Sequence, residues 1–442
     1  MGSAYPLGIY KCVRLLTCRA GGVLGQTVAE RILSTKSGHD VKAGDLVICP
    51  VDLAYVQDGT GPLTFRQMEK MGIAGAANPS RSIVFIDHAS PPPRKELAAD
   101  HVYMREFAAK TGMVLRDIGE GVCHQVAVEW YVRPWDVVIG ADSHTVMGGA
   151  LGAFATGMGS TDVAVAIGLG KTWLRVPESL RFEVKGTFPK GVMSKDLILR
   201  VLGDIRTDGA TYMSMEWGGP TIRAMPMHER MTLSNMAIEA GGKCGPIASD
   251  DVTKRYLAAH GREADWRPIE ADADATYEQV YDYDASDVEP IVATPGSEDN
   301  VVPVTDPSLK GVPIHQVYLG SCTNGRYEDI EVFAKLVSDE TKAPNTRVIV
   351  TPASKEAYRK ALKAGYLGVL MEFGAMINSP GCAACPGVHG GIPGDGENVL
   401  STQNRNYTGR MGNPNAFVYL GSPMTAAATA IYGVITDPRT VV

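Results

Sequence analysis

Short apolar runs recur along the chain, and most of them end in a cluster of polar residues. Five of these runs read SIVFIDH (82–88), WDVVIGADSH (135–144), HQVYLGSCTNG (315–325), RVIVTPAS (347–354) and AFVYLGSP (416–423). Runs this short, bounded by glycine or polar residues, fit buried parallel strands better than helices. The string VYLGS occurs in two of them, which suggests two equivalent strands in one domain.

Helical patterns lie between the apolar runs. YEDIEVFAKLV (327–337) and SKDLILRVLGDI (194–205) each repeat apolar residues at helical spacing, and Ser194 is the expected cap of the second. Alternating strands and helices predict an α/β protein with largely parallel sheets. Ligands of such sheets gather beyond the carboxyl ends of the strands, where the polar clusters are expected.

Two segments are typical of domain boundaries. One lies near Val176-Pro177, and the other is the stretch ATPGSEDNVVPVTDPSLKGVP, rich in proline, glycine and acid. We therefore predict three α/β domains, over residues 1–177, 178–295 and 296–442. The third domain contains Cys322, Cys382 and Cys385.

Composition and charge exclude some classes of function. The chain has 442 residues, 45% hydrophobic and 21% charged, and a net charge of −7, which argues against nonspecific binding to nucleic acid or an anionic membrane. Residues 1–29 are basic, with no acid before Glu30. We interpret residues 1–25 as an N-terminal extension or a misplaced start, and expect a cytoplasmic protein, with mitochondrial targeting as the alternative.

The pair Cys382 and Cys385 lies in the stretch SPGCAACPGVHGG. It could be a redox dithiol, half of a zinc site, part of an iron–sulfur site, or two incidental loop thiols. A redox dithiol usually opens a helix, and the proline and glycine that follow the pair disfavour this interpretation. A zinc site is disfavoured because the sequence has no second C-x-x-C and no clear histidine motif. Cys322, sixty residues earlier in GSCTNG, supplies a third thiol at a strand end. Three thiolates could hold a cluster and leave one iron open, as a catalytic zinc keeps an open position.

Two histidine-containing clusters follow predicted strands. Asp87-His88 suits an imidazole tuned for proton transfer, and the alternative is a polar pair that closes a turn. Asp142, Ser143 and His144 resemble a hydrolase triad superficially. Adjacent side chains point apart, however, and no G-x-S-x-G elbow is present.

A buried carboxylate is predicted in LSNMAIEAGG. Asn235 and Glu239 are four residues apart, so they are expected to share a helix face among apolar neighbours. Glu239 then needs a partner such as His124 or His144. Without that context, His124 would be interpreted as a partly buried histidine.

The loop STQNRNYTGRMG contains Asn404, Arg405 and Arg410. Its two arginines suit the binding of a carboxylate or a phosphate by forked donors, and the alternative is a pair of surface arginines. Together, the acid/base pairs, the arginines and the three thiols indicate chemistry on a small acidic substrate assisted by a Lewis-acid iron.

The motifs GADSHT, GGALGAFATGMGSTD, LSNMAIEAG, GSCTNGRYEDI, SPGCAAC and STQNRNYTGRMG, in this order, resemble the aconitase superfamily. The similarity extends from about Thr27 to the C-terminus and is strongest to large subunits of the 3-isopropylmalate dehydratase and homoaconitase type. It implies three α/β domains around a central iron–sulfur cleft, without the swivelling fourth domain. The family often has CGPCLG where this chain has CAACPG, beside the expected substrate cavity.

The resemblance also implies a cofactor and roles. A 4Fe–4S cluster would be bound by Cys322, Cys382 and Cys385, with one iron not ligated by cysteine, and Asp87-His88 would protonate the leaving hydroxyl. The residues that match the family's catalytic positions are Asp87, His88, His124, Asp142, Ser143, His144 and Glu239. Those that match its substrate-binding positions are Gln57, Asn235, Asn404, Arg405 and Arg410.

The superfamily's catalytic base is a serine in the signature Y-G-x-G-S-S-R-E-H, which this chain lacks. The resemblance therefore implies a small partner subunit that carries the swivelling domain, in a heterodimer or heterotetramer, with no nucleic acid or membrane partner.

The expected activity is that of a hydro-lyase acting on a hydroxy-dicarboxylate, with 3-isopropylmalate the first candidate. Homoaconitate, 2,3-dimethylmalate, methylmalate (citraconate) and maleate are the alternatives. Rivals of another class are an iron-responsive RNA-binding regulator and a non-catalytic scaffold that retains the cluster.

Overall fold

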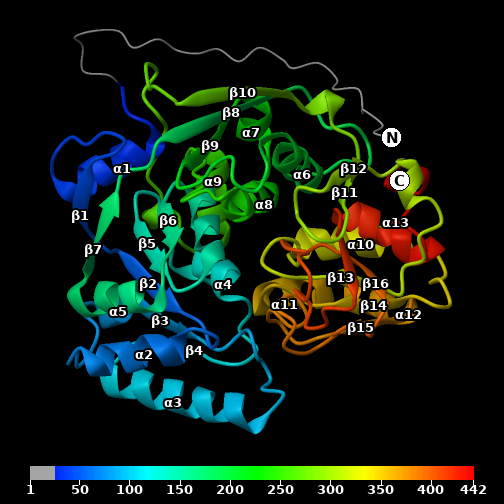
Figure 1. Cartoon of the computed structure of the whole chain (residues 1–442), viewed down its shortest axis with the longest axis horizontal. Helices are drawn as coiled ribbons and strands as arrows, with labels where there is room; N and C mark the ends of the chain where they lie inside the picture. Colours follow the sequence, from blue (N-terminus) through cyan, green and yellow to red (C-terminus); the bar gives the residue numbers. More distant parts are fainter. Residues whose placement is uncertain (1–24) are drawn as a thin grey trace, which may run out of the picture.

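The structure is a computed structural model that describes residues 25–442, so the expected extension over residues 1–25 lies outside the described residues apart from Gly25. It confirms the α/β class: helices alternate with strands that form three sheets of three or more strands and one two-stranded sheet (Figure 1). Among the described helices, none is long and apolar enough to cross a bilayer.

The first sheet has five strands in the order β4-β3-β2-β5-β6, and all neighbours in it are parallel. Its strands are β2 (Leu53–Val56), β3 (Ser82–Phe85), β4 (Val114–Arg116), β5 (Val137–Gly140) and β6 (Phe154–Gly157). The helices of this part of the chain are α1 (Val28–Ser37), α2 (Gly61–Lys70), α3 (Lys95–Thr111), α4 (Cys123–Trp130) and α5 (Ser160–Leu169). An antiparallel pair, β1 (Leu46–Pro50) and β7 (Lys171–Arg175), stands beside it. All four residues of each of the strands β2, β3 and β5 are buried, which agrees with their mostly apolar sequences.

The second sheet has three parallel strands in the order β10-β8-β9. They are β8 (Ser179–Lys185), β9 (Ser214–Gly218) and β10 (Gln279–Asp284). Its helices are α6 (Ser194–Ile205), α7 (Pro220–Ala224), α8 (Met227–Asn235) and α9 (Asp251–Ala259). The expected cap of α6 was wrong by one residue. Met193 is the N-cap, because the Asp196 carboxylate accepts the Met193 N–H at 2.8 Å, and Ser194 is the first helical residue.

The third sheet has seven strands in the order β12-β11-β17-β16-β13-β14-β15. They are β11 (Ile291–Ala293), β12 (Val301–Pro303), β13 (Gln316–Leu319), β14 (Arg347–Val350), β15 (Ala375–Ile377), β16 (Asn398–Ser401) and β17 (Phe417–Leu420). The helices are α10 (Tyr327–Val337), α11 (Lys355–Lys363), α12 (Tyr366–Glu372) and α13 (Pro423–Tyr432). The two VYLGS copies form β13 and β17, which both border β16 in this sheet, so the expectation of two equivalent strands is confirmed.

All five apolar runs form strands, and the two helical patterns form α10 and α6 with the predicted bounds. The sheets change near the proposed domain boundaries, but β11 lies before residue 296 and joins the third sheet. The boundaries at 177 and 296 stay a prediction. Buried clusters of apolar side chains form the core, and the three predicted cysteines, which lie in loops, belong to two of these clusters.

Candidate active site

The polar clusters lie at the carboxyl ends of parallel strands, as predicted. Gln57 follows β2, Asp87-His88 follows β3, and Asp142 follows β5 in the first sheet; Cys322 follows β13 in the third. Parallel strands present their carboxyl ends at one edge of a sheet, so two sheets that face each other bring these loops together.

These loops enclose a cavity of about 190 Å³. Twelve of the fifteen predicted site residues line it, together with Pro386. The twelve are Gln57, His88, His124, Asp142, Ser143, His144, Cys322, Cys382, Cys385, Asn404, Arg405 and Arg410. The other three, Asp87, Asn235 and Glu239, stand behind this lining and contact it.

Two of the cavity's histidines are held by carboxylates from other parts of the chain. His124 Nε2 lies 2.9 Å from Asp142 Oδ1, and His144 Nε2 lies 2.6 Å from Glu239 Oε1. The His144 contact confirms one of the two partners expected for Glu239. The element differs from the expectation: α8 ends at Asn235, and Glu239 lies on the 3₁₀ turn Met236–Ala240.

The third histidine–carboxylate pair is the sequence-adjacent one. His88 Nδ1 lies 3.0 Å from Asp87 Oδ1, which turns the other ring nitrogen toward Cys382. Asp87 is held in turn, because Oδ2 accepts the backbone N–H of Cys123 at 2.7 Å. Burial lowers the pKa of His88, but the charges of Cys382, Asp87 and Asp142 outweigh burial and raise it well above its ordinary value.

The carboxylates of the other two pairs stay ionised at neutral pH. Burial raises the pKa of Asp142, but His124 and the hydrogen bonds from His144 and His88 outweigh burial and hold this pKa well below the usual range. Burial acts the same way on Glu239, and Arg405 and His144 reverse it, so the pKa of this carboxyl is also lowered.

Sequence reasoning missed Asp58, which directly follows the predicted Gln57. Its Oδ1 accepts the backbone N–H groups of Asp87 at 3.0 Å and of His88 at 2.7 Å. Its Oδ2 accepts the N–H of Ala89 at 2.8 Å and faces His101 Nε2 at 3.0 Å. Asp58 therefore positions the Asp87-His88 pair. Its place directly after an apolar strand was the signal in the sequence.

The three predicted cysteines all line the cavity, and donors surround two of them. Asn235 Nδ2 lies 3.2 Å and Asn404 Nδ2 3.6 Å from Cys322 Sγ, and Arg410 Nη2 lies 3.4 Å from Cys385 Sγ. Amide and guanidinium N–H groups stabilise thiolates rather than thiols. The Cys382–Cys385 segment forms turns, not a helix start, so the reason for disfavouring a redox dithiol holds.

Thiolate chemistry at Cys322 needs a cation. Burial raises the pKa of its thiol to about 12, so the thiolate forms when a metal replaces the proton. Among residues 25–442, two groups of side chains have ligand atoms close enough for a single ion, and neither group contains two of the three cysteines. Each iron of a 4Fe–4S cluster takes one thiolate, so separated thiols around one cavity fit a cluster.

The two arginines differ in their surroundings. Arg405 Nε donates to Glu239 Oε2 at 2.8 Å, and its side chain keeps 23% of its surface exposed. Arg410 is close to Cys385, and its buried Nε has no hydrogen-bond partner among the described residues. Both guanidinium groups line the cavity, where their forked N–H donors suit a carboxylate. In the unusual CAACPG stretch, Ala383 and Ala384 are buried away from the cavity, and Pro386 is the residue that lines it.

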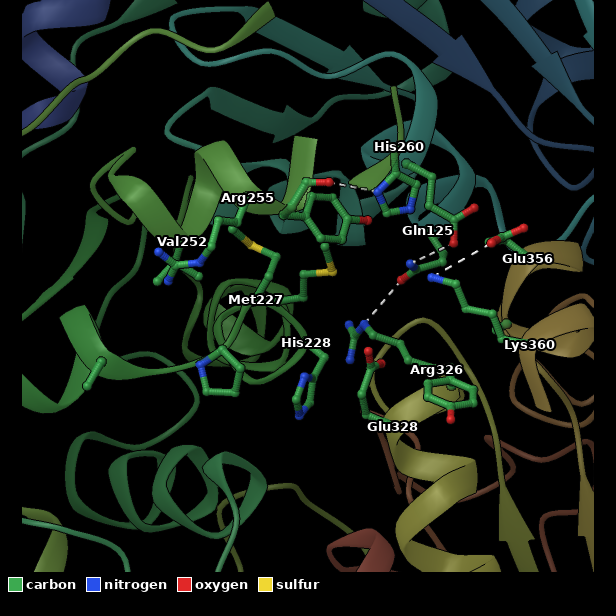
Figure 2. A pocket seen from close by; sticks show the side chains of 17 residues that line it. Gln125, Met227, His228, Val252, Arg255, His260, Arg326, Glu328, Glu356 and Lys360 are labelled. Carbon is green, nitrogen blue, oxygen red and sulfur yellow. Dashed lines mark hydrogen bonds and ion pairs between the residues drawn. The ribbon is translucent and has the colours of Figure 1, made fainter. Parts of the chain in front are cut away.

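A separate cavity of about 370 Å³ lies between α4, α9 and α11 (Figure 2). None of the fifteen predicted residues lines it. It touches the site through Arg326, whose Nε donates to Gln125 Oε1 at 3.1 Å and whose Nη2 donates to the Cys322 carbonyl at 2.7 Å. The convergence of titratable groups and thiols marks the smaller cavity as the candidate active site.

Residues 30–433 match the aconitase family (aconitate hydratase), and the chain belongs to that family. It is 53% identical to the "3-isopropylmalate dehydratase large subunit" of Elusimicrobium minutum over 414 residues, 94% of this chain and 99% of that protein. It is 49% identical to "3-isopropylmalate dehydratase large subunit 2" of Archaeoglobus fulgidus, over 94% of this chain and 99% of that protein. A solved structure, the holo-form of Thermococcus kodakaraensis aconitase X, superposes with a TM-score of 0.49 at 12% identity, over 85% of this chain and 88% of that one.

Proposed function

We propose that the chain is the large subunit of a 3-isopropylmalate dehydratase, a hydro-lyase of leucine biosynthesis. Relatives at 53% and 49% identity that match almost end to end carry this activity in their names. The observation that carries the proposal is the single cavity that gathers three histidine–carboxylate pairs, three thiols and two arginines.

Cys322, Cys382 and Cys385 would hold a 4Fe–4S cluster, and its iron without a cysteine ligand would supply the Lewis acid that polarises the substrate hydroxyl. Amide donors at Cys322 and the guanidinium at Cys385 support this assignment, because they offset the charge of bound thiolates.

His88 is the proposed proton donor to the leaving hydroxyl. Asp87 accepts from its Nδ1, which directs the proton on Nε2 into the cavity. The pKa of His88 is raised above its ordinary value, which favours the ring that carries the proton given to the leaving hydroxyl as the carbon–oxygen bond breaks.

His124 and His144 are proposed to bind the departing water. Each ring has one nitrogen fixed by a carboxylate, at 2.9 Å for Asp142 and 2.6 Å for Glu239, so the tautomer and the orientation are set before the substrate binds. Gln57, whose amide donates to Asp142 Oδ2 at 3.2 Å, lies beside this water position.

Arg405 and Arg410 are proposed to bind the substrate carboxylates, and Asn404 lies beside them in the cavity. The proton on the neighbouring carbon needs a base, and the proposed source is a serine of a small partner subunit. The relatives' designation as large subunits supports a partner of this kind.

The test is an anaerobic assay with 3-isopropylmalate and a co-expressed small subunit, with iron–sulfur absorbance and product absorbance measured together. We expect turnover with both subunits and an intact cluster. A panel of homoaconitate, 2,3-dimethylmalate, citramalate and malate separates the related hydro-lyases. Full activity in cluster-free protein would refute the iron mechanism, and a preference of tenfold or more for another acid, in kcat/KM, would refute the substrate.

A further inference from the structure

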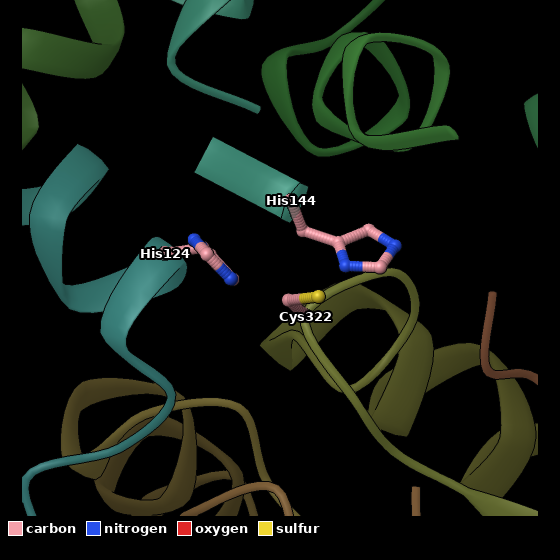
Figure 3. A group of neighbouring side chains, drawn as sticks. All are labelled: His124, His144 and Cys322. Atoms are coloured by element: carbon pink, nitrogen blue, oxygen red, sulfur yellow. The ribbon is translucent and has the colours of Figure 1, made fainter. Parts of the chain in front are cut away.

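His124, His144 and Cys322 come together from three different elements of the chain (Figure 3). His124 lies on α4, His144 on the 3₁₀ segment Ser143–Leu151, and Cys322 in the loop after β13. One ligand atom of each lies within 4.8 Å of the others, and all three residues are buried. Two imidazoles and one thiolate are a common ligand set for zinc.

Hydrogen bonds fix the orientation of both rings. Glu239 binds His144 Nε2, so Nδ1, with the Ser143 hydroxyl at 3.3 Å, is the nitrogen available to an ion. The Tyr55 hydroxyl lies 2.8 Å from His124 Nδ1, and Asp142 Oδ1 lies 2.9 Å from Nε2, so an ion at Nε2 would take the place of the proton between this nitrogen and Asp142. Metal-binding histidines characteristically have their second nitrogen held by a carboxylate or another polar group, and this arrangement is already built here.

Small side-chain rotations suffice to close the site. At ordinary zinc bond lengths, nitrogen and sulfur donors of a tetrahedral ion stand about 3.5 Å apart. The three atoms lie within 4.8 Å, so each moves by about 1 Å or less. Asp142 Oδ1, 2.9 Å from His124 Nε2, adds a negative charge next to the ion.

We propose that, without an iron–sulfur cluster, the chain binds one zinc ion through His124, His144 and Cys322. The Cys322 thiol releases its proton to solvent as the zinc–sulfur bond forms, and the imidazoles bind as neutral ligands. The fourth position faces the cavity, which all three residues line, and takes water.

The site shares Cys322 with the proposed cluster, so the two metals exclude each other. A zinc ion on Cys322 withholds one of three thiolates and occupies the water position between the histidines. Zinc binding itself does not depend on the proposed function. The mutual exclusion of zinc and the iron–sulfur cluster rests on the proposed function.

The first experiment separates this site from the Cys382–Cys385 pair. Full-length, chelator-treated Cys382→Ser/Cys385→Ser protein is titrated with Co²⁺ as a tetrahedral probe and then with Zn²⁺. We expect one equivalent of Co²⁺ with a thiolate charge-transfer band, which one equivalent of Zn²⁺ displaces. Absence of that band in the folded double variant would overturn the proposal.

Two further variants assign the ligands. Cys322→Ser and His144→Gln should each weaken Zn²⁺ binding by more than the 10–100-fold that loss of an outer partner costs. His228→Gln, at a histidine outside the site, is the control and should bind as the parent does. Far-UV circular dichroism and the melting temperature establish that each variant is folded, and a band that survives in folded Cys322→Ser would refute the assignment.

The exclusion is measured by reconstitution. Cluster-free wild-type protein loaded with one equivalent of Zn²⁺ should fail to gain iron–sulfur absorbance until a chelator removes the zinc. Equal reconstitution with and without zinc would refute the exclusion. If no cluster forms under any condition while the Co²⁺ band is present, the proposed function fails and the zinc site stands.

Discussion

Replacing Asp58 by asparagine tests whether one buried carboxylate positions the proposed acid. Asp58 accepts four hydrogen bonds, two at each oxygen, from Asp87, His88, Ala89 and His101. Asparagine retains one acceptor oxygen and puts an NH₂ group at the other position. If the asparagine oxygen takes the place of Oδ1, the NH₂ group takes the place of Oδ2, and the hydrogen bonds from Ala89 and His101 are lost.

The magnitude follows from the number of bonds lost. A hydrogen bond to a charged group contributes about 1.5–3 kcal/mol, so two lost bonds lower the free energy of unfolding by about 3–6 kcal/mol. The loop that carries His88 then shifts toward the space beside Ala89. A displacement of about 1 Å at a reacting group lowers kcat by about 100-fold, and we expect that loss with a smaller change in KM.

The pH dependence has a defined sign. Burial raises the pKa of Asp58, but the His101 hydrogen bond, the charge of His88 and the backbone N–H groups outweigh it and hold the pKa well below its usual range. A carboxyl with a lowered pKa stabilises the fold above its unfolded pKa and loses that contribution as pH falls toward its folded pKa. The wild type should therefore lose stability below about pH 5, and Asp58→Asn should lack this part of the acid dependence.

The assay is urea unfolding between pH 3 and pH 8, together with kcat and KM on the two-subunit enzyme. Asp136→Asn is the matched control, because Asp136 is a buried carboxylate that accepts from Arg81 and the Arg133 N–H away from the cavity. It should lose stability and keep kcat. If folded Asp58→Asn keeps kcat within twofold of the wild type, Asp58 has no positioning role.

Three further predictions concern the cavity. Cys385→Ser should abolish iron–sulfur absorbance and activity in reconstituted protein, whereas Cys49→Ser, at a buried thiol of β1, should change neither; equal absorbance in both variants would contradict the ligand assignment. Arg405→Lys removes the forked donor and its bond to Glu239, so kcat/KM should fall about 10–100-fold, and an unchanged value would exclude carboxylate binding by Arg405. Glu239→Gln keeps an acceptor for His144 but removes the charge, so kcat should fall by about 100-fold, as measured at saturating substrate, with a loss below threefold contradicting the role.

The local pattern determined the elements of this protein. Apolar runs of about four residues between polar clusters predicted β3, β5, β13, β14 and β17, because strands buried on both faces, as β3, β5 and β13 are, favour continuous apolar side chains. Their order with the helices predicted parallel sheets, and with them the place of the site at the strand ends. Most of the residues that line the cavity were identified in this way and through the aconitase motifs.

The sequence did not determine which side chains pair. Glu239 had two candidate partners in the sequence, and the turn after α8 puts it on His144 and Arg405. The positioning role of Asp58 and the grouping of His124, His144 and Cys322 were missed, because the residues in contact come from different strands and loops. The chain itself encodes strands and helices through short-range periodicity, whereas the site also needs contacts between distant residues, such as Glu239 and Arg405, which are 166 positions apart. Those contacts form when the loops after the strands of different sheets meet around one cavity, so the tertiary structure alone decided them.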